Sequence, residues 1–318
     1  MDNEAFILAD SGESDINRII IYCTPSMLSL LSKSNTWFVD GAFTVCPSLF
    51  YQLYTINVMF HRKNMPCMYA LLPGKKTEHY LRLFNLIVPH FKNAPNVIMS
   101  DFEKAELNVI RDHQFYKDTT VRACYFHFAQ NLWRNMQVKH LSNLYISDSK
   151  VHSSFKRLKS LAYLKPADVI VGFEFIKDIS ELFGDMILYF EKYYIGALKP
   201  ESKNLRKVPS FPILLWNCYE SSLGDGVNTN NNIEAWHLQF ELDVGKHLTV
   251  NKFIHQLQLE QKNTDIFYSQ LQNGDNYIPT KNSRANADRI RKIVLNYPDI
   301  LNKEEVLQYL DSLSSNCN

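Results

Sequence analysis

The alternation of apolar and polar positions between Thr36 and Leu72 is typical of β-strands. Three runs rich in β-branched and aromatic residues cover 37–45, 50–60 and 67–72, and short polar breaks separate them. Breaks of this length favour antiparallel hairpins. Apolar residues then recur at helical spacing over 78–91. This part of the chain therefore predicts a meander of three strands with a helix packed on it.

Beyond this helix, the pattern changes to short strands that each lead directly into a helix. An apolar run at 96–100 precedes a helical pattern at 103–113, and a strand at 120–125 precedes a helix at 126–136. Because a helix joins these later strands, we expect them to be parallel. The order predicts a mixed α/β fold.

Helical spacing dominates from residue 141 to 225, which predicts an all-helical insertion. Further helices are expected from Ile233, over 250–268 and over 303–313. The expected organisation is an N-terminal extension (1–35), a split α/β core (36–140 and 228–270), a helical insertion (141–227) and a C-terminal basic stretch with a helix (271–318).

Composition narrows the class of protein. A chain of 318 residues, 46% of them hydrophobic, can form a large core. Its net charge of +1 excludes a strongly basic protein that covers nucleic acid. Its longest apolar runs, about five residues, are far below the roughly 18 of a membrane span. The acidic N-terminus does not resemble a secretory signal. Six scattered cysteines without a C-x-x-C pair fit reduced thiols, so we expect an intracellular protein.

Two aspartates are candidates for chemistry. Asp40 lies inside an apolar strand, where a carboxylate is costly unless it is paired, protonated or bound to a metal; the alternative is a bulge or a surface position. Asp101 ends the fourth strand, where ligands of open α/β sheets collect, and its alternative role is to cap the following helix. If these strands are neighbours, both carboxylates could share one Mg²⁺ ion.

Glu234 is the best candidate for a third carboxylate. It follows the polar run Asn230–Asn232 and begins a new helix. The alternative is a glutamate in the first helical turn that interacts favourably with the helix dipole, which is a common arrangement.

Six short stretches occur in the order in which one transposase family has them. They are Val39-Asp40-Gly41-Ala42-Phe43 with Pro47, Phe50 to Ile56, Pro66 to Leu72, Ser100 to Ala105, Cys124 to Phe128 and Asn231 to His237. The chain thereby resembles the catalytic domain of Mutator-like element (MULE) transposases, a DDE-type group with a ribonuclease H-like fold. The resemblance spans residues 36 to 260.

The resemblance implies that Asp40, Asp101 and Glu234 form the DDE triad of a DNA transposase. It implies an α/β fold with a ribonuclease H-like mixed five-stranded sheet, flanked by helices and interrupted by the helical insertion. The 133 residues between Asp101 and Glu234 (234 minus 101) accommodate that insertion. The triad would hold two Mg²⁺ or Mn²⁺ ions, roughly 4 Å apart, that clamp an in-line displacement.

The implied reaction is metal-dependent cleavage of a DNA strand, followed by joining of its 3′-hydroxyl to a target. Its partners would be double-stranded DNA, both transposon ends and target, and no membrane. The expected location is the nucleus, and a homo-oligomer is compatible with this activity.

Three further residues are secondary candidates. Cys124 and His127 match the family's C-x-x-H motif. Their spacing could supply half of a zinc site, but no second pair is evident and a structural zinc needs four ligands. Zinc is therefore not expected, and a packed or hydrogen-bonded pair beside the active site is favoured. His237, one turn after Glu234, could contact a scissile phosphate or form a hydrogen bond within its helix layer.

Basic residues gather in two groups that could follow a DNA backbone by neutralising its charge. For each of them, a solvated helix face is the alternative. The candidates for DNA contact are Arg134, Lys139, Lys156, Arg157, Lys159, Arg289, Arg291 and Lys292.

Two departures from the family keep another class of function open. The family often has Thr at the position of Ala42, and many members carry an upstream zinc-binding module for DNA recognition, whose Cys/His spacing is not seen before residue 36. The competing hypothesis is a transposase-derived, non-catalytic DNA-binding or regulatory protein. A nuclease that acts on RNA or repair intermediates is a third.

Overall fold

The structure is a computed structural model that describes residues 6–177, 181–202, 205–224, 231–244, 249–278 and 281–315. It consists of two compact units: unit 1 contains residues 1–122 and 230–279, and unit 2 contains residues 123–229 and 280–318. The first division of the chain thus falls after residue 122 rather than after residue 140. The C-terminal residues from 280 are part of unit 2 rather than a separate stretch.

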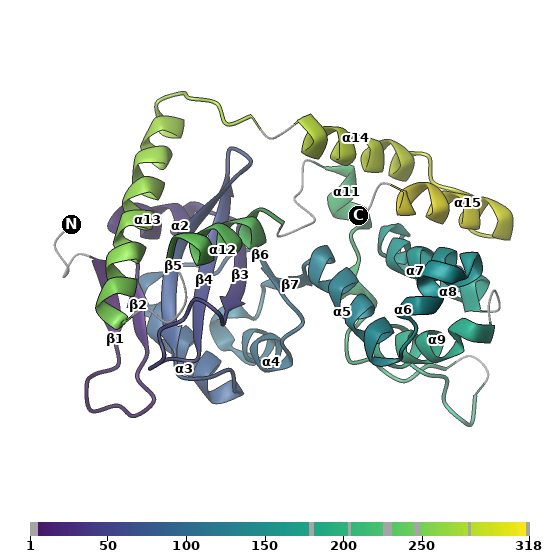
Figure 1. Ribbon diagram of the computed structural model, residues 1–318, viewed down its shortest axis with the longest axis horizontal. Coiled ribbons are helices and arrows are strands. Elements are labelled where there is room, and N and C mark those ends of the chain that lie inside the picture. Colours follow the sequence, from purple (N-terminus) through teal and green to yellow (C-terminus); the bar gives the residue numbers. More distant parts are fainter. Residues whose placement is uncertain are drawn as a thin grey trace. The chain divides into compact units, whose positions relative to one another are not determined.

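Unit 1 is built on a mixed seven-stranded sheet with the order β1-β2-β5-β4-β3-β6-β7 (Figure 1). The pairs β3–β4 and β4–β5 are antiparallel, and β6 is parallel to β3. This is the mixed α/β class that the sequence predicts. The strands are β1 (Ile7–Asp10), β2 (Ile20–Tyr22), β3 (Thr36–Ala42), β4 (Gln52–Phe60), β5 (Lys63–Leu72), β6 (Val97–Ser100) and β7 (Thr120–Ala123).

The sheet has two strands more than the five expected, because residues before Thr36 also contribute to it. They supply β1, β2 and the helix α2 (Pro25–Lys33). β2 is antiparallel to β5. Ile21 within β2 and Ile19 directly before it are fully buried. β1 and β2 are four and three residues long, so neither shows enough alternation to be recognised from its pattern.

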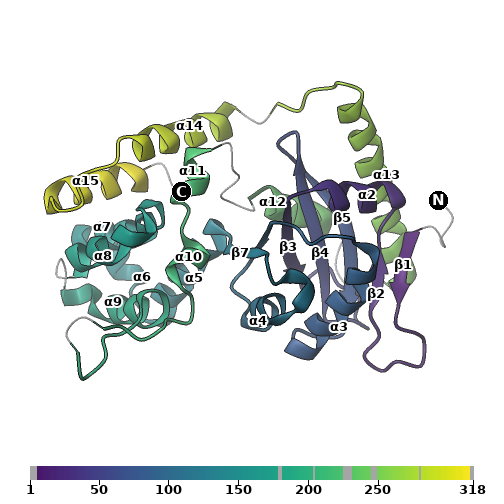
Figure 2. The same cartoon turned by 180° about the vertical axis from the view of Figure 1, so that it is seen from behind.

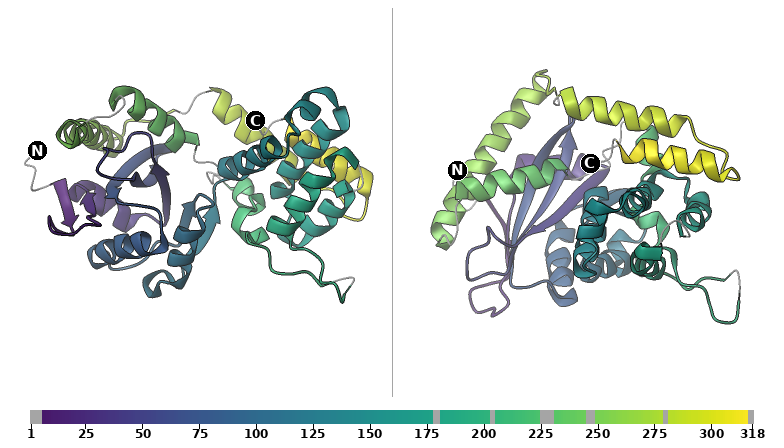
Figure 3. Two further views of the ribbon diagram at one scale, coloured as in Figure 1. Left: turned by 60° about the horizontal axis from the view of Figure 1, so that its bottom comes forward. Right: turned by 45° about the vertical axis from the view of Figure 1, so that its right-hand side comes forward.

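Helices cover both faces of the sheet (Figures 2 and 3). On one face, α12 (Asn231–Val244) and the first half of α13 (Val250–Gln272) pack through Phe240, Phe253 and Leu257. On the other face lie α3 (Thr77–Ile87) and α4 (Lys104–Asp112), which bury Phe84 and Ile110. Short 3₁₀ turns follow α3 (Val88–His90) and α4 (Gln114–Tyr116).

Unit 2 is helical, as predicted for residues 141 to 225, and its core is aromatic. Phe128 stacks on Trp216 with ring centroids 4.9 Å apart and planes 4° apart, and Phe190 and Tyr194 pack around them, all fully buried. Its α-helices are α5 (Tyr125–Val138), α6 (Ser142–Ser147), α7 (Ser149–Ser160), α8 (Val169–Lys177), α9 (Gly184–Phe190), α10 (Ile213–Trp216), α11 (Tyr219–Leu223), α14 (Lys281–Leu295) and α15 (Lys303–Ser314). Shorter turns are Leu161–Tyr163, Pro166–Asp168, Glu181–Phe183 and the π-helix Glu191–Ile195.

Throughout the ranges that the structure describes, we find no helix that combines the length and the apolarity needed to span a bilayer.

Candidate active site

Asp40 lies near the end of β3, a central strand of unit 1. It is opposite Thr55 of β4 and only 6% exposed. The backbone N–H of Gly41 donates to its Oδ1 at 2.9 Å. A buried carboxylate inside an apolar strand costs free energy of solvation. Asp40 is therefore neither a surface residue nor an incidental member of the hydrophobic core.

Asp101 follows β6 directly, on the strand that neighbours β3 in parallel. The register pairs Phe38 with Met99, so Asp40 and Asp101 each come two residues after a paired position. Because parallel strands end at the same edge of a sheet, the two aspartates belong to one edge. Oδ1 of Asp101 also accepts a hydrogen bond of 2.8 Å from the backbone N–H of Glu103, which helps to start α4.

Cross-strand pairing shows which helix covers the face that carries Asp40. Asp40 pairs with Thr55, and Thr55 pairs with Tyr69 of β5, so these side chains share one face. The ring of Tyr69 lies 5.9 Å from that of Trp236 on α12. α12 therefore packs on this face. It also contains Glu234, but the side chains of Glu234 and His237 lie outside the described part of the structure.

Glu106 on α4 is a buried carboxyl group that the sequence analysis does not identify. It is 2% exposed, its Oε2 accepts a hydrogen bond of 2.6 Å from Ser100 Oγ, and its Oε1 accepts one from the hydroxyl of Tyr54. Ser100 ends β6, and Tyr54 on β4 is opposite Gly41 of β3. Glu106 thus connects β4 and β6, the two strands on either side of β3.

The pKa of Glu106 reports the electrostatics of this edge. Burial raises the pKa of Glu106 to about 8, and the negative charge of Asp101 adds to that rise. Hydrogen bonds from Ser100 and Tyr54 oppose it, and Asp40 contributes a further, smaller increase. Glu106 is therefore mainly protonated at neutral pH, while it lies within the electrostatic range of two aspartates.

A pattern in the sequence could have identified Glu106. Val109 and Ile110 are the other buried residues of α4, and Glu106 precedes them by three and four positions. Residues at these spacings share one face of a helix. A glutamate in the apolar stripe of an amphipathic helix is the signal, and it is easily mistaken for a solvated residue of the first turn.

The donor set at this edge suits a hard divalent cation. Asp40 and Asp101 supply carboxylate oxygens, the ligands that Mg²⁺ and Mn²⁺ prefer. A cation would also relieve the repulsion that contributes to the raised pKa of Glu106. Across the described residues, no three His, Cys, Asp or Glu side chains form a ready ligand group. A complete site would need a further ligand, and Glu234 is the one that the sequence suggests.

Cys124 and His127 both belong to unit 2. Cys124 precedes α5 as its N-cap residue and is fully buried, and the ring of His127 contacts that of Phe126 with centroids 5.7 Å apart. A metal-ligand group of three that includes either residue is not found among the described residues.

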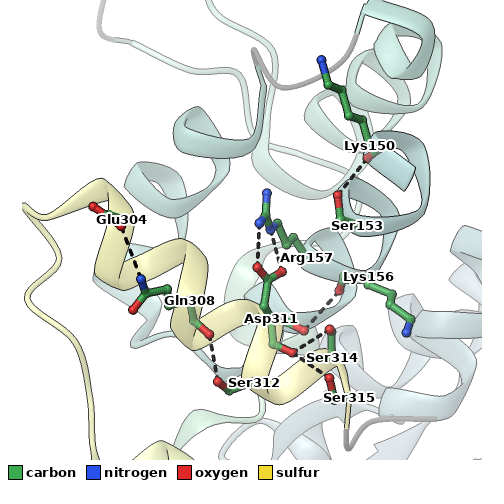
Figure 4. Close-up of polar contacts among 11 residues, drawn as sticks. Lys150, Ser153, Lys156, Arg157, Glu304, Gln308, Asp311, Ser312, Ser314 and Ser315 are labelled. Carbon is green, nitrogen blue, oxygen red and sulfur yellow. Dashed lines mark hydrogen bonds and ion pairs between the residues drawn. The ribbon is translucent and has the colours of Figure 1, made fainter. Parts of the chain in front are cut away.

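Arg157 forms a salt bridge inside unit 2 (Figure 4). Its Nε and Nη2 donate to the two carboxylate oxygens of Asp311 at 2.7 and 2.6 Å, which joins α7 to α15. Lys156 lies on the same helix and is half-buried. The charge of Arg157 is matched within the fold, so a DNA phosphate would have to compete with Asp311 for it.

The other basic candidates lie at the surface of unit 2. Arg134 on α5 is exposed, Lys139 is half-buried, and the amino group of Lys159 lies 5.6 Å from the ring of Phe155. α14 exposes the remaining three candidates: Arg289, Arg291 and Lys292.

A comparison with protein-family models gives one match. Residues 36–131 match the family model described as the MULE transposase domain. This segment runs from β3 into α5, so it contains Asp40, Asp101 and Glu106 but not Glu234. None of the curated proteins searched matches the chain.

Proposed function

We propose that this protein, whose residues 36–131 form a MULE transposase domain, cleaves a DNA strand and joins the resulting 3′-hydroxyl to a second DNA. One observation carries the proposal. Asp40 near the end of β3 and Asp101 directly after β6 lie toward the same edge of two parallel neighbouring strands, where burial, and then the charges of Asp101 and Asp40, raise the pKa of Glu106. This is the arrangement expected of a phosphoryl-transfer site that holds a cation.

The acidic residues have two different proposed roles. Asp40 and Asp101 hold Mg²⁺ or Mn²⁺, with Glu234 of α12 as the third ligand. When bound, two such ions supply Lewis-acid stabilisation of the scissile phosphate and lower the pKa of the attacking water. Glu106 does not bind the ions in this proposal. It remains neutral and fixes the ends of β4 and β6 through Tyr54 and Ser100.

We also propose that the five strands β3 to β7 form a ribonuclease H-like sheet, to which β1 and β2 are additions. An antiparallel meander of β3, β4 and β5, followed by β6 parallel to β3, supports this assignment. Unit 2, which interrupts unit 1 in the sequence, is the proposed counterpart of the family's helical insertion.

The proposed substrate is double-stranded DNA, held in part by the basic residues of unit 2, and the proposed location is the nucleus. Each phosphate contact releases counterions, so binding should weaken steeply as the salt concentration rises. The exposed residues Arg289 and Lys292 are stronger candidates than Arg157, which is engaged with Asp311.

Nicking of supercoiled plasmid with Mg²⁺ or Mn²⁺ tests this function without knowledge of the terminal sequences. The wild-type chain should nick the plasmid, and Asp40→Asn and Asp101→Asn should abolish nicking while they retain salt-dependent binding. Asp118→Asn is the matched control, because Asp118 is an exposed aspartate of unit 1. Nicking that persists in Asp40→Asn would refute the proposal. DNA binding without nicking by the wild type would instead support the non-catalytic alternative.

A further inference from the structure

Three connections of unit 1 meet at the sheet edge that carries Asp40 and Asp101. They are the β3–β4 connection (43–51), the β5–α3 connection (73–76) and the β6–α4 connection (101–103). They share this edge because β3, β5 and β6 end here and β4 begins here. Side chains of these connections would therefore be the first to meet a strand of DNA that approaches the two aspartates.

These connections expose two aromatic rings and a lysine. Phe43 and Tyr51 are each 47% exposed, and the side chain of Lys75 is 49% exposed. By contrast, the aromatic pair of Trp37 and Phe91 in unit 1 is buried. Leaving two large rings in water forgoes the free energy of burying them. An exposed aromatic pair at a candidate active site is therefore a candidate binding surface.

A continuous set of contacts joins this pair to the loop of Asp101. The rings of Phe43 and Tyr51 meet edge to face, with centroids 5.6 Å apart and planes at 76°. The Nζ atom of Lys75 lies 5.6 Å from the centre of the Phe43 ring and 3.8 Å from Oε2 of Glu103. Glu103 is two residues after Asp101.

The pair also lies close to the backbone that carries Asp40. A Cβ atom placed on Gly41 would be 3.9 Å from Cζ of Phe43, so the tip of this ring reaches the residue next to Asp40. The Phe43 ring thus lies beside the backbone position next to Asp40, while Lys75 links the ring to the loop of Asp101.

The chemistry of this surface favours the base of an unpaired nucleotide. Exposed aromatic rings stack on bases whatever their sequence, and a neighbouring cation attracts the phosphate backbone. A base that is paired within a duplex does not present its faces to a protein side chain. A purely apolar partner would make no use of the positive charge of Lys75, whereas a nucleotide provides both a ring and an anion.

We propose that Phe43, Tyr51 and Lys75 form a stacking platform for an unpaired base of the DNA strand whose phosphate lies at Asp40 and Asp101. The inference rests on the proposed function and specifies its substrate. The preferred substrate is a DNA end with unpaired nucleotides, either frayed or overhanging, rather than a fully paired end.

Binding of fluorescent oligonucleotides in EDTA, where no cleavage occurs, tests the platform. The probes are a duplex with a short 3′ overhang that carries 2-aminopurine and the matching blunt duplex. Wild-type protein should quench the 2-aminopurine by stacking and bind the overhang about tenfold more tightly than the blunt end. The double variant Phe43→Leu/Tyr51→Leu should lose the quenching and the preference, while its affinity for the blunt duplex is unchanged.

The chain offers a matched control for the aromatic chemistry. Elsewhere in unit 1, Nζ of Lys63 lies 5.6 Å from the Phe267 ring and 5.2 Å from the Tyr277 ring. Tyr277→Leu should leave both quenching and preference unchanged. Lys75→Met, a change at an exposed side chain, serves if the double variant does not fold. It should weaken binding of the overhang and make that binding less sensitive to salt, while quenching persists.

The platform is overturned if wild type binds both probes equally, or if the double variant still quenches and prefers the overhang. It is also overturned if a folded double variant loses affinity for both probes to the same extent. Failure of the proposed function gives a different result. Asp40→Asn should still quench the probe, and the function fails if that variant nicks DNA or if the wild type does not, whatever the platform variants do.

Discussion

The two units surround a buried carboxyl group with opposite charges. In unit 2, the buried Glu191 is matched by cations, because Oε1 of Glu191 lies 2.8 Å from Nη1 of Arg206 and 3.4 Å from Nζ of Lys177. In unit 1, the buried Glu106 is held by two hydroxyl groups and lies in the field of Asp101 and Asp40. Carboxyl groups that raise one another's pKa reduce stability. The difference indicates that unit 2 is arranged for stability, and the edge of unit 1 for chemistry.

The largest expected effect on stability concerns the aromatic core of unit 2. Trp216→Ala removes a fully buried ring that stacks on Phe128, so it should lower the free energy of unfolding of unit 2 by about 3–5 kcal/mol. Denaturant unfolding measures the loss, and limited proteolysis should show new cleavage within unit 2. A loss below about 1 kcal/mol would contradict the assignment of this stack to the core.

The next effect is a change with pH in the free energy of unfolding that Glu106 causes. Its direction is opposite to the one that a carboxyl group with a lowered pKa produces. The pKa of Glu106 is about 8 in the folded protein, against 4.5 for the unperturbed group, so the folded state keeps a proton that the unfolded state releases. The contribution of Glu106 to stability is therefore fully present below pH 4.5 and is lost as the pH rises toward 8. Glu106→Gln mimics the protonated form and should become progressively more stable than wild type over this range.

This effect is measured by denaturant unfolding of both proteins in EDTA at several pH values between 4.5 and 8. The exposed Glu78→Gln is the matched control and should track wild type. If the difference between Glu106→Gln and wild type does not change with pH, Glu106 does not retain its proton and the electrostatic contrast between the units disappears.

The sequence predicted most elements of unit 1 because their patterns are local. The runs at 50–60 and 96–100 correspond closely to β4 and β6, and the helical pattern at 103–113 corresponds to α4. β1 and β2 could not be predicted, because strands this short are stabilised by pairing, β1 with β2 and β2 with β5, rather than by their own pattern. α14 was not predicted either, since its residues are mostly polar and few of them are apolar.

The candidate site was predictable to a smaller extent. The strand pattern places Asp40 inside one strand and Asp101 at the end of another, and the parallel β3–β6 pairing brings both toward one edge of the sheet. The helical spacing places Glu106 on the apolar face of α4, but its hydrogen bond with Tyr54 is a tertiary contact that no local pattern specifies. The exposure of Phe43 and Tyr51 is likewise a property of the folded edge, since aromatic residues in a strand-rich segment are usually buried.

The smallest expected effect concerns the surface of unit 2. Arg157→Met removes a salt bridge in which Arg157 is 16% and Asp311 45% exposed, so solvent screens much of the interaction. We expect a loss of about 1 kcal/mol or less in the stability of unit 2. DNA affinity should change less than in Arg289→Ala, because only the latter removes an exposed cation. A larger loss of DNA affinity in Arg157→Met would show that Arg157 exchanges Asp311 for a phosphate.

Backbone cleavage by bound Fe²⁺ tests most directly whether Asp40 and Asp101 hold a divalent cation. Fe²⁺ that replaces Mg²⁺ generates radicals in the presence of ascorbate and peroxide, and these cut the chain next to the metal's ligands. We predict cuts beside Asp40 and Asp101 and within α12 near Glu234, suppressed by excess Mg²⁺ and absent from Asp40→Asn. Cuts at other positions that persist in Asp40→Asn, or the absence of cuts beside both aspartates, would contradict a metal site at this edge.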